Sequence, residues 1–181
     1  MTSFYSNQEL SELGLKSFGS NVFISKKASL YGIASISVGN NVRIDDFCIL
    51  SGHITIGSHV HIAAYSALYG AMGIEIESHT VLSSRVVVYS AIDDFGGDYL
   101  ISPTEKPEYT HVTGGKVLIK QYACIGTNAT IFPGLTINEG AVVGAHSFVK
   151  KSLNEWVIYA GCPVKKLKNR SRGLSRYVVD K

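Results

Sequence analysis

Charged residues, prolines and cysteines are all scarce in this sequence of 181 residues. Charged residues make up 17% of the chain, against about 25% in an average soluble domain. The four prolines argue against a disordered linker protein. The three cysteines, Cys48, Cys124 and Cys162, match no zinc or redox motif in their spacing. The composition therefore favours one ordered domain with an aliphatic interior and reduced thiols.

Targeting signals and nucleic-acid signals are also missing. The first residues do not resemble a signal peptide, and no apolar run approaches the ~18 residues of a membrane span. The sequence therefore predicts a cytoplasmic protein without a membrane span. The net charge is +3, and no interleaved aromatic platform accompanies the basic residues, so they indicate a solvated end or phosphate ligands rather than nucleic acid. These late basic residues are Lys150, Lys151, Lys165, Lys166, Lys168, Arg170, Arg172 and Arg176.

An aliphatic residue recurs every six positions along most of the chain, with a small or apolar residue four places after it. Shorter runs extend from Ile44 to Leu68 and from Ile76 to Val88. A helix repeats near 3.6 residues and a strand at 2, so neither explains this period. Three short straight sides joined by corners close a coil of about 18 residues, which predicts an all-β solenoid. The clearest run is Ile119, Ile125, Ile131, Ile137, Val143 and Val149.

The period divides the chain into three parts. Residues 1–19 form an N-terminal helical segment, residues 20–152 form the solenoid, and residues 153–181 form a C-terminal cap with a basic tail. A loop at 90–114 interrupts the solenoid, and long loops inside compact repeats are usually functional. The packed inward positions cannot host chemistry, so chemistry is expected on the corners, on the loop or between subunits.

The N-terminal segment carries the signals of one short helix. Ser6 is a suitable N-cap, Glu9 follows three residues later, and Gly14 is a stop signal.

Three motifs in order resemble the hexapeptide acyltransferases, including galactoside and maltose O-acetyltransferases and polysaccharide-biosynthesis acetyltransferases. They are the repeat from Ile119 to Ile137 with its Phe-Pro-Gly, then Val143-Gly-Ala-His-Ser-Phe-Val-Lys-Lys, then Ala160-Gly-Cys-Pro-Val-Lys-Lys. The resemblance implies a left-handed parallel β-helix. It also implies a homotrimer, with acetyl-CoA as acyl donor in the cleft between neighbouring subunits.

The resemblance also implies a cofactor path along the late coils. In the family, the pantetheine arm contacts backbone groups and small side chains there, and lysines near the end meet the nucleotide phosphates. The glycines also suit plain turns. The matching positions are Tyr122, Gly126, Thr127, Gly144, Ala145, Lys150, Lys151, Lys165 and Lys168.

The loop departs from the family pattern, because Asp93 stands where sugar O-acetyltransferases of this fold usually place a catalytic histidine. No histidine lies between His79 and His111. Asp93 and Asp94 are candidate bases if repulsion and partial burial raise one pKa; the alternative is that they cap a turn. His79 and His111 are the next candidates, ahead of His146. Candidate substrate-binding residues are Arg85, Tyr89, Ser90, Asp45 and Asp46.

The favoured function is acetyl transfer from acetyl-CoA to a sugar hydroxyl in surface polysaccharide synthesis, by direct general-base-assisted attack. The nearest alternative is N-acetylation of a nucleotide-linked amino sugar, which needs less help from a base. Two distant alternatives are a zinc carbonic anhydrase-like hydratase, suggested by His53, His59, His61 and His79, and a non-catalytic binding scaffold.

Overall fold

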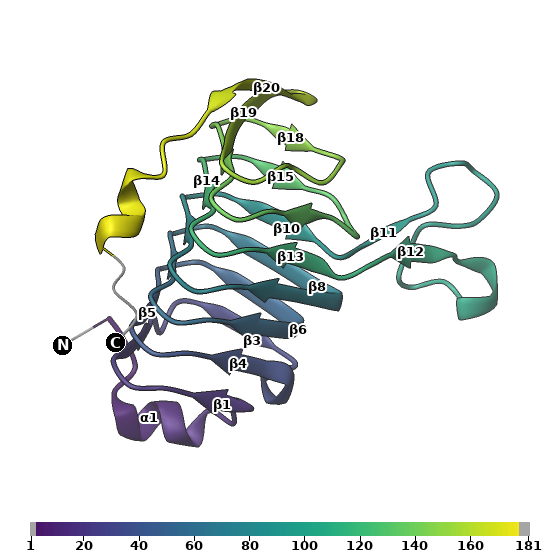
Figure 1. Cartoon of the computed structure of the whole chain (residues 1–181). Helices are drawn as coiled ribbons and strands as arrows, with labels where there is room; N and C mark the ends of the chain where they lie inside the picture. The colour runs from purple at the N-terminus through teal and green to yellow at the C-terminus, as the bar shows by residue number, and fades with distance from the viewer. Residues whose placement is uncertain (1–2, 178–181) are drawn as a thin grey trace.

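The chain forms a three-sided parallel β-coil with one projecting hairpin (Figure 1), seen in a computed structural model that describes residues 3–177. Residues 1–2 and 178–181 of the predicted terminal segments lie outside this range. No helix in the described range is long and apolar enough to cross a membrane. The solenoid prediction from the six-residue period is confirmed.

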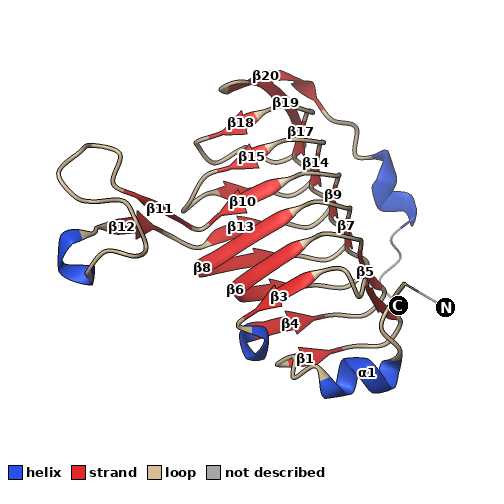
Figure 2. Ribbon diagram, turned by 180° about the vertical axis from the view of Figure 1, so that it is seen from behind, coloured by secondary structure: helices blue, strands red, loops and turns tan. Residues whose placement is uncertain are grey.

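The three sides are called A, B and C, and Figure 2 shows their strands stacked coil upon coil. Side A comprises β2 (Val22–Ile24), β5 (Val42–Ile44), β7 (His61–Ile62), β9 (Val81–Leu82), β14 (Cys124–Ile125), β17 (Val142–Val143) and β19 (Val157–Gly161), with β20 (Val164–Asn169) antiparallel at its end. Side B comprises β1 (Ser17–Phe18), β4 (Ile36–Val38), β13 (Val117–Ile119) and β16 (Thr136–Ile137). Side C comprises β3 (Ser29–Tyr31), β10 (Val87–Tyr89), β15 (Thr130–Ile131) and β18 (Phe148–Val149). The long strands β6 (Ile49–Ile56) and β8 (Ala67–Ile76) run from side C around a corner onto side B.

The remaining elements lie at the ends and in the loop. Helix α1 (Asn7–Glu12) closes the base, and its capping box uses Ser6 and Glu9 as predicted. The predicted loop contains β11 (Ala91–Asp93) and β12 (Val112–Gly114), paired antiparallel as a hairpin, with η2 (Pro107–Tyr109) between them. The other short helices are η1 (Ile33–Ser35) and η3 (Gly173–Tyr177).

The coil extends beyond the predicted boundaries at both ends. Ser17 already pairs in parallel with Ser37, before residue 20, and Ile158 pairs in parallel with Val142, beyond residue 152. The six-residue pattern of aliphatic residues is irregular in these end coils, because α1 and β20 cover them in place of another coil. Coil length also varies: Leu50 pairs with Leu68, whereas Ile54 pairs with Ile74, so some coils are two residues longer than others.

The aliphatic hexad positions form one continuous column inside the coil. The late run from Ile119 through Ile125 and Ile131 to Val149 is 0% exposed throughout, and the earlier runs are also buried. Burying such a side chain contributes about 1.5–3 kcal/mol, so this column is the main source of cohesion.

Two of the three corners are occupied mainly by residues larger than glycine in the left-handed backbone region. The first corner joins side B to side A, and the second joins side A to side C. An L-residue with positive φ costs roughly 1–2 kcal/mol, and contact between stacked rings offsets part of this. The first-corner column is Asn21, Asn41, His59, His79, Tyr122, Gly140 and Trp156, and the second-corner column is Phe47, Tyr65, Arg85, Asn128 and His146.

Gly140 allows the stacking at the first corner to continue. Its φ is 64°, and a Cβ there would lie 2.5 Å from an atom of the Trp156 ring, whereas a Cβ at Gly134, φ 71°, meets only Gly115 at 3.9 Å. We expect Gly134→Ala to cost about 1–2 kcal/mol of unfolding free energy from φ alone, and Gly140→Ala to cost a further ~1–3 kcal/mol from overlap with Trp156. Denaturant unfolding of both variants checks this, and equal losses would contradict it.

Glu9 ties α1 to the coil through charge. A hydrogen bond from Lys26, with bonds from Ser6, lowers the pKa of Glu9 to about 2. Since its pKa is near 4.3 in an unfolded chain, its contribution to stability is complete above that value and disappears as pH falls toward 2. We therefore expect Glu9→Gln to lower the Tm at pH 7 and the deficit to shrink steadily between pH 5 and pH 3. Lys26→Gln should behave alike, and a deficit independent of pH in both variants would count against the ion pair.

Candidate active site

The second corner brings four predicted cofactor-binding residues together. Gly126 and Thr127 lie one coil below Gly144 and Ala145, because Gly126 N–H donates to the Val143 carbonyl at 2.7 Å. A Cβ at Gly126 would lie 2.6 Å from the Ala145 nitrogen, so coil stacking itself requires glycine there. Gly126, Thr127 and Gly144 are half-buried and Ala145 is exposed, so these residues form a narrow edge along which an extended ligand can lie.

Lysines flank the upper end of this edge. Lys165 pairs with Ala160, which continues the column above Gly144, and Lys168 pairs with Ile158. Lys150 and Lys151 follow β18 on side C. None of these four lysines forms an ion pair with any residue in the range 3–177. Their charges are available for an anionic ligand such as a phosphate.

Tyr122 and His79 lie elsewhere, on the first corner. The Tyr122 ring stands between His79, with centroids 5.6 Å apart, and Trp156, at 6.1 Å. His79 also stacks on His59 at 4.7 Å with an interplanar angle of 5°. Within one chain, side A separates this ring column from Gly126, and the hairpin leaves at the third corner, between sides C and B. His79 therefore does not meet the loop aspartates of its own chain.

Asp94 shapes the hairpin instead of standing as a free base. Its carboxylate accepts N–H donors from Gly96 at 2.8 Å, Asp98 at 3.0 Å and Tyr99 at 3.2 Å. These bonds, with a smaller effect of the nearby His111, hold the pKa of Asp94 below its ordinary value. The expected raised pKa is therefore wrong for Asp94, because main-chain donors stabilise its charged form.

Asp93 and His111 lie on the hairpin with fewer constraints. Asp93 pairs with Val112 across the hairpin and borders a groove of about 340 Å³ at its base. Tyr89, which stacks on Tyr69 at 5.2 Å, and Phe132 form the apolar wall of this groove. His111 is exposed and stacks on Tyr99 at 5.0 Å. Asp93, Tyr89 and Phe132 thus line one groove with a single carboxylate, and His111 lies outside this lining.

Ser90 does not fit a substrate-binding role. Its side chain is fully buried; its hydroxyl donates to the Tyr69 carbonyl at 3.0 Å and accepts from the Met72 N–H at 2.8 Å. Arg85 lies over the Tyr65 ring at 5.2 Å on the second corner, away from the hairpin aspartates. Both residues hold adjacent coils together.

Asp45 and Asp46 are occupied within the chain. Asp45 accepts from Arg43 at 2.7 Å and from His61 at 2.8 Å; partial burial opposes these bonds, but together they lower its pKa. Asp46 accepts from Ser25 and Lys27, and its pKa is lowered chiefly by the Ser25 bond. Their oxygens are committed to neighbours, which weakens the suggested role in sugar binding.

The histidines that suggested zinc are dispersed within the chain. His59 and His79 stack on the first corner, His61 bonds Asp45 on side A, and His53 lies near the third corner. Across residues 3–177 there is no group of three His, Cys, Asp or Glu side chains that could hold a metal ion.

Sequence reasoning missed Ser84. It occupies the same place after Leu82 that Thr127 occupies after Ile125, and its carbonyl accepts the Asn128 N–H at 3.2 Å. Neither the Ser84 nor the Thr127 hydroxyl has a hydrogen-bond partner among the described residues. His146 stands next to Asn128, with Nε2 and Nδ2 3.3 Å apart. The six-residue repeat could have placed Ser84 at this edge, because it makes Ser84 equivalent to Thr127.

Comparison with known proteins agrees with this geometry. The family described as bacterial transferase hexapeptide (six repeats) matches residues 35–70. A dTDP-4-amino-4,6-dideoxy-D-glucose acyltransferase of Escherichia coli is 41% identical over 92% of this chain and 88% of its own. A variant of an N-acyltransferase from Bacillus cereus, solved with dTDP and coenzyme A, is 54% identical over 98% of this chain and 96% of its own, with a TM-score of 0.96.

A putative lipopolysaccharide biosynthesis O-acetyltransferase of Escherichia coli K12 is a more distant relative, 30% identical over 74% of this chain and 71% of its own. Likeness of this extent settles the hand of the coil as well as the class of enzyme. The chain is a left-handed parallel β-helix and belongs to the hexapeptide-repeat acyltransferases.

Proposed function

We propose that this enzyme transfers an acyl group from acyl-coenzyme A to the 4-amino group of dTDP-4-amino-4,6-dideoxyglucose or a close nucleotide-linked amino sugar. The observation that carries the proposal is the 54% identity and TM-score of 0.96 with the Bacillus cereus N-acyltransferase over almost all of both chains. The amino-sugar alternative thus replaces the sugar hydroxyl first favoured from the sequence, since the O-acetyltransferase relative is only 30% identical.

The chemistry of the hairpin supports an amine acceptor. A neutral amine attacks a thioester carbonyl through its lone pair without first losing a proton. The C–N bond forms, the ammonium so created loses its proton readily, and the C–S bond then breaks to release the coenzyme A thiol. An alcohol must give up its proton as it attacks, so it needs a general base whose pKa lies near neutral pH. Asp94 has a lowered pKa, and the sequence has no histidine between His79 and His111.

The donor is proposed to lie along the second corner. The main-chain edge from Gly126 to Ala145 suits the extended pantetheine arm, and Lys165 and Lys168 suit the phosphates at its upper end. Lys150 and Lys151 are further phosphate candidates from side C. Tyr122, at the first corner, flanks the arm only if a neighbouring subunit brings that corner close.

The acceptor is proposed to lie near the hairpin and the Ser84 hydroxyl. Solved forms of the Bacillus cereus relative include variants at a serine and at an aspartate, the residue types found here in Ser84, Asp93 and Asp94. Asp93, Tyr89 and His111 contact the sugar, and Asp94 positions the hairpin. The second and third corners are apart within one chain, so the site is completed between subunits of a homotrimer.

The acceptor assay tests this function. Purified protein is given acetyl-CoA and dTDP-4-amino-4,6-dideoxyglucose, and free thiol is measured while mass spectrometry locates the acyl group. We expect amide formation at least roughly a hundredfold faster than acylation of the matched sugar with a hydroxyl at the same carbon, because that hydroxyl lacks base catalysis. A parallel arm uses 3-hydroxybutyryl-CoA, the donor bound by the Bacillus cereus relative. Equal or faster acylation of the hydroxyl sugar would overturn the proposal.

Asp94 offers a second test of mechanism. We expect Asp94→Asn to lower kcat/KM by less than about tenfold, because a general base contributes 10²–10⁴ and a carboxylate of lowered pKa is poorly suited to that task. The kcat/KM of Asp93→Asn, the same substitution at the adjacent residue, is measured for comparison. A loss of more than about a hundredfold in folded Asp94→Asn, with an ionisation missing from its pH–rate profile, would assign proton removal to Asp94.

A further inference from the structure

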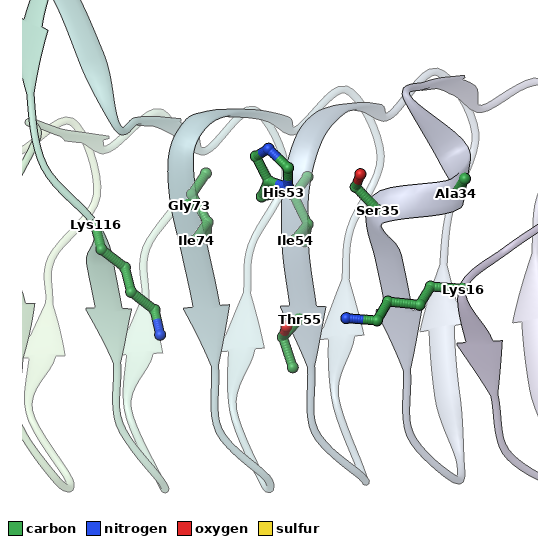
Figure 3. A pocket seen from close by; sticks show the side chains of 9 residues that line it. All are labelled: Lys16, Ala34, Ser35, His53, Ile54, Thr55, Gly73, Ile74 and Lys116. Atoms are coloured by element: carbon green, nitrogen blue, oxygen red, sulfur yellow. The ribbon is translucent and has the colours of Figure 1, made fainter.

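A groove of about 510 Å³ lies on side B beside the third corner, away from the second-corner edge. In Figure 3, Lys16 and Lys116 reach into it from opposite ends, with their ammonium groups directed toward Thr55 between them. His53 and Ser35 lie at the end nearest the corner. Five polar side chains from distant parts of the sequence therefore face one hollow.

The groove carries uncompensated positive charge and unused donors. The Lys16 ammonium and the Ser35 and Thr55 hydroxyls have no hydrogen-bond partner within the described part of the chain. Lys116 pairs with Glu75, but no carboxylate lines the groove itself. The two ammonium groups of Lys16 and Lys116 thus have only the Glu75 carboxylate at the rim to balance them, which leaves a net positive charge. Lysine ammonium groups bind phosphates as point charges.

The fold holds these groups in place from the backbone outward. Lys16 N–H donates to the Ile36 carbonyl at 3.0 Å, which fixes one wall. Thr55 lies on β6, which is paired on both sides. A Cβ at Gly73 would lie 3.4 Å from the Lys116 Cγ, so the glycine leaves room for the lysine stem. Lys116 follows β12 after one residue, which puts the groove at the base of the hairpin.

We propose that this groove binds the diphosphate of the nucleotide-linked acceptor, an inference that rests on the proposed function. A diphosphate needs two separated cations and several hydrogen-bond donors, which Lys16, Lys116 and Thr55 supply. Acyl-coenzyme A also carries phosphates, but the second-corner edge has its own lysines. The position beside the hairpin base puts the sugar of such a ligand near the acceptor candidates.

Steady-state kinetics of charge variants test the assignment. Lys16→Gln and Lys116→Gln should each raise the KM for the nucleotide sugar about tenfold, the scale of one charge-assisted hydrogen bond, and leave the KM for acetyl-CoA unchanged. Glu75→Gln should act oppositely and lower the nucleotide-sugar KM, because it releases Lys116. The control is Lys120→Gln, since Lys120 lies on side B, pairs with Glu77 at 3.4 Å and does not line the groove.

Calorimetric titration of the full-length protein with dTDP separates this inference from the proposed function. Binding that is weakened in both lysine variants, even without acyl transfer to any amino sugar, would support the groove while the proposed function fails. Normal turnover of the amino sugar with unchanged KM in both lysine variants would overturn the groove. A rise in the KM for acetyl-CoA instead would also overturn it, by assigning the cations to the donor.

Discussion

The column of aliphatic side chains inside the coil is the constraint on which the rest of the molecule depends. Each coil places Ile, Leu or Val directly above its counterpart, and the strands of neighbouring coils pair residue by residue. A slip of one residue would turn every inward side chain outward. The column therefore fixes the position of each corner residue and of the outward side chains on each side of the coil.

The three corners have different properties because their residues meet different neighbours. At the first corner, the rings from His59 to Trp156 stack on one another. At the second, Gly126 and Gly144 are half-buried and Ala145 is exposed, and these small residues stack along the coil axis. At the third, the insertion of residues 90–114 carries a carboxylate pair outward, and the groove with Lys16 and Lys116 lies beside its base. The proposed function, with its donor at the second corner and its acceptor near the third, therefore requires a site shared between subunits.

The sequence predicted the fold well because a solenoid has a local code. The six-residue repeat identified the buried column, the insertion and the return of the coil after it, at Val117. Ser6 and Glu9 predicted the capping box. The code says little about outward side chains, whose partners lie one coil away. Arg85 is close to the loop aspartates in sequence, yet it lies over Tyr65 of the coil below. Ser90 was misassigned for the same reason: its hydroxyl bonds to main-chain groups of Tyr69 and Met72 in the neighbouring coil.

The same limit explains the error over Asp94. Two adjacent acidic residues suggest mutual repulsion and a raised pKa, but the ionisation of a carboxylate depends on the donors around it. In the hairpin, Gly96, Asp98 and Tyr99 turn their N–H groups toward Asp94, so the charged form is the stable one. A carboxylate of lowered pKa is a poor proton acceptor but a good anchor for the turn. The lowered pKa thus argues against activation of an alcohol by Asp94.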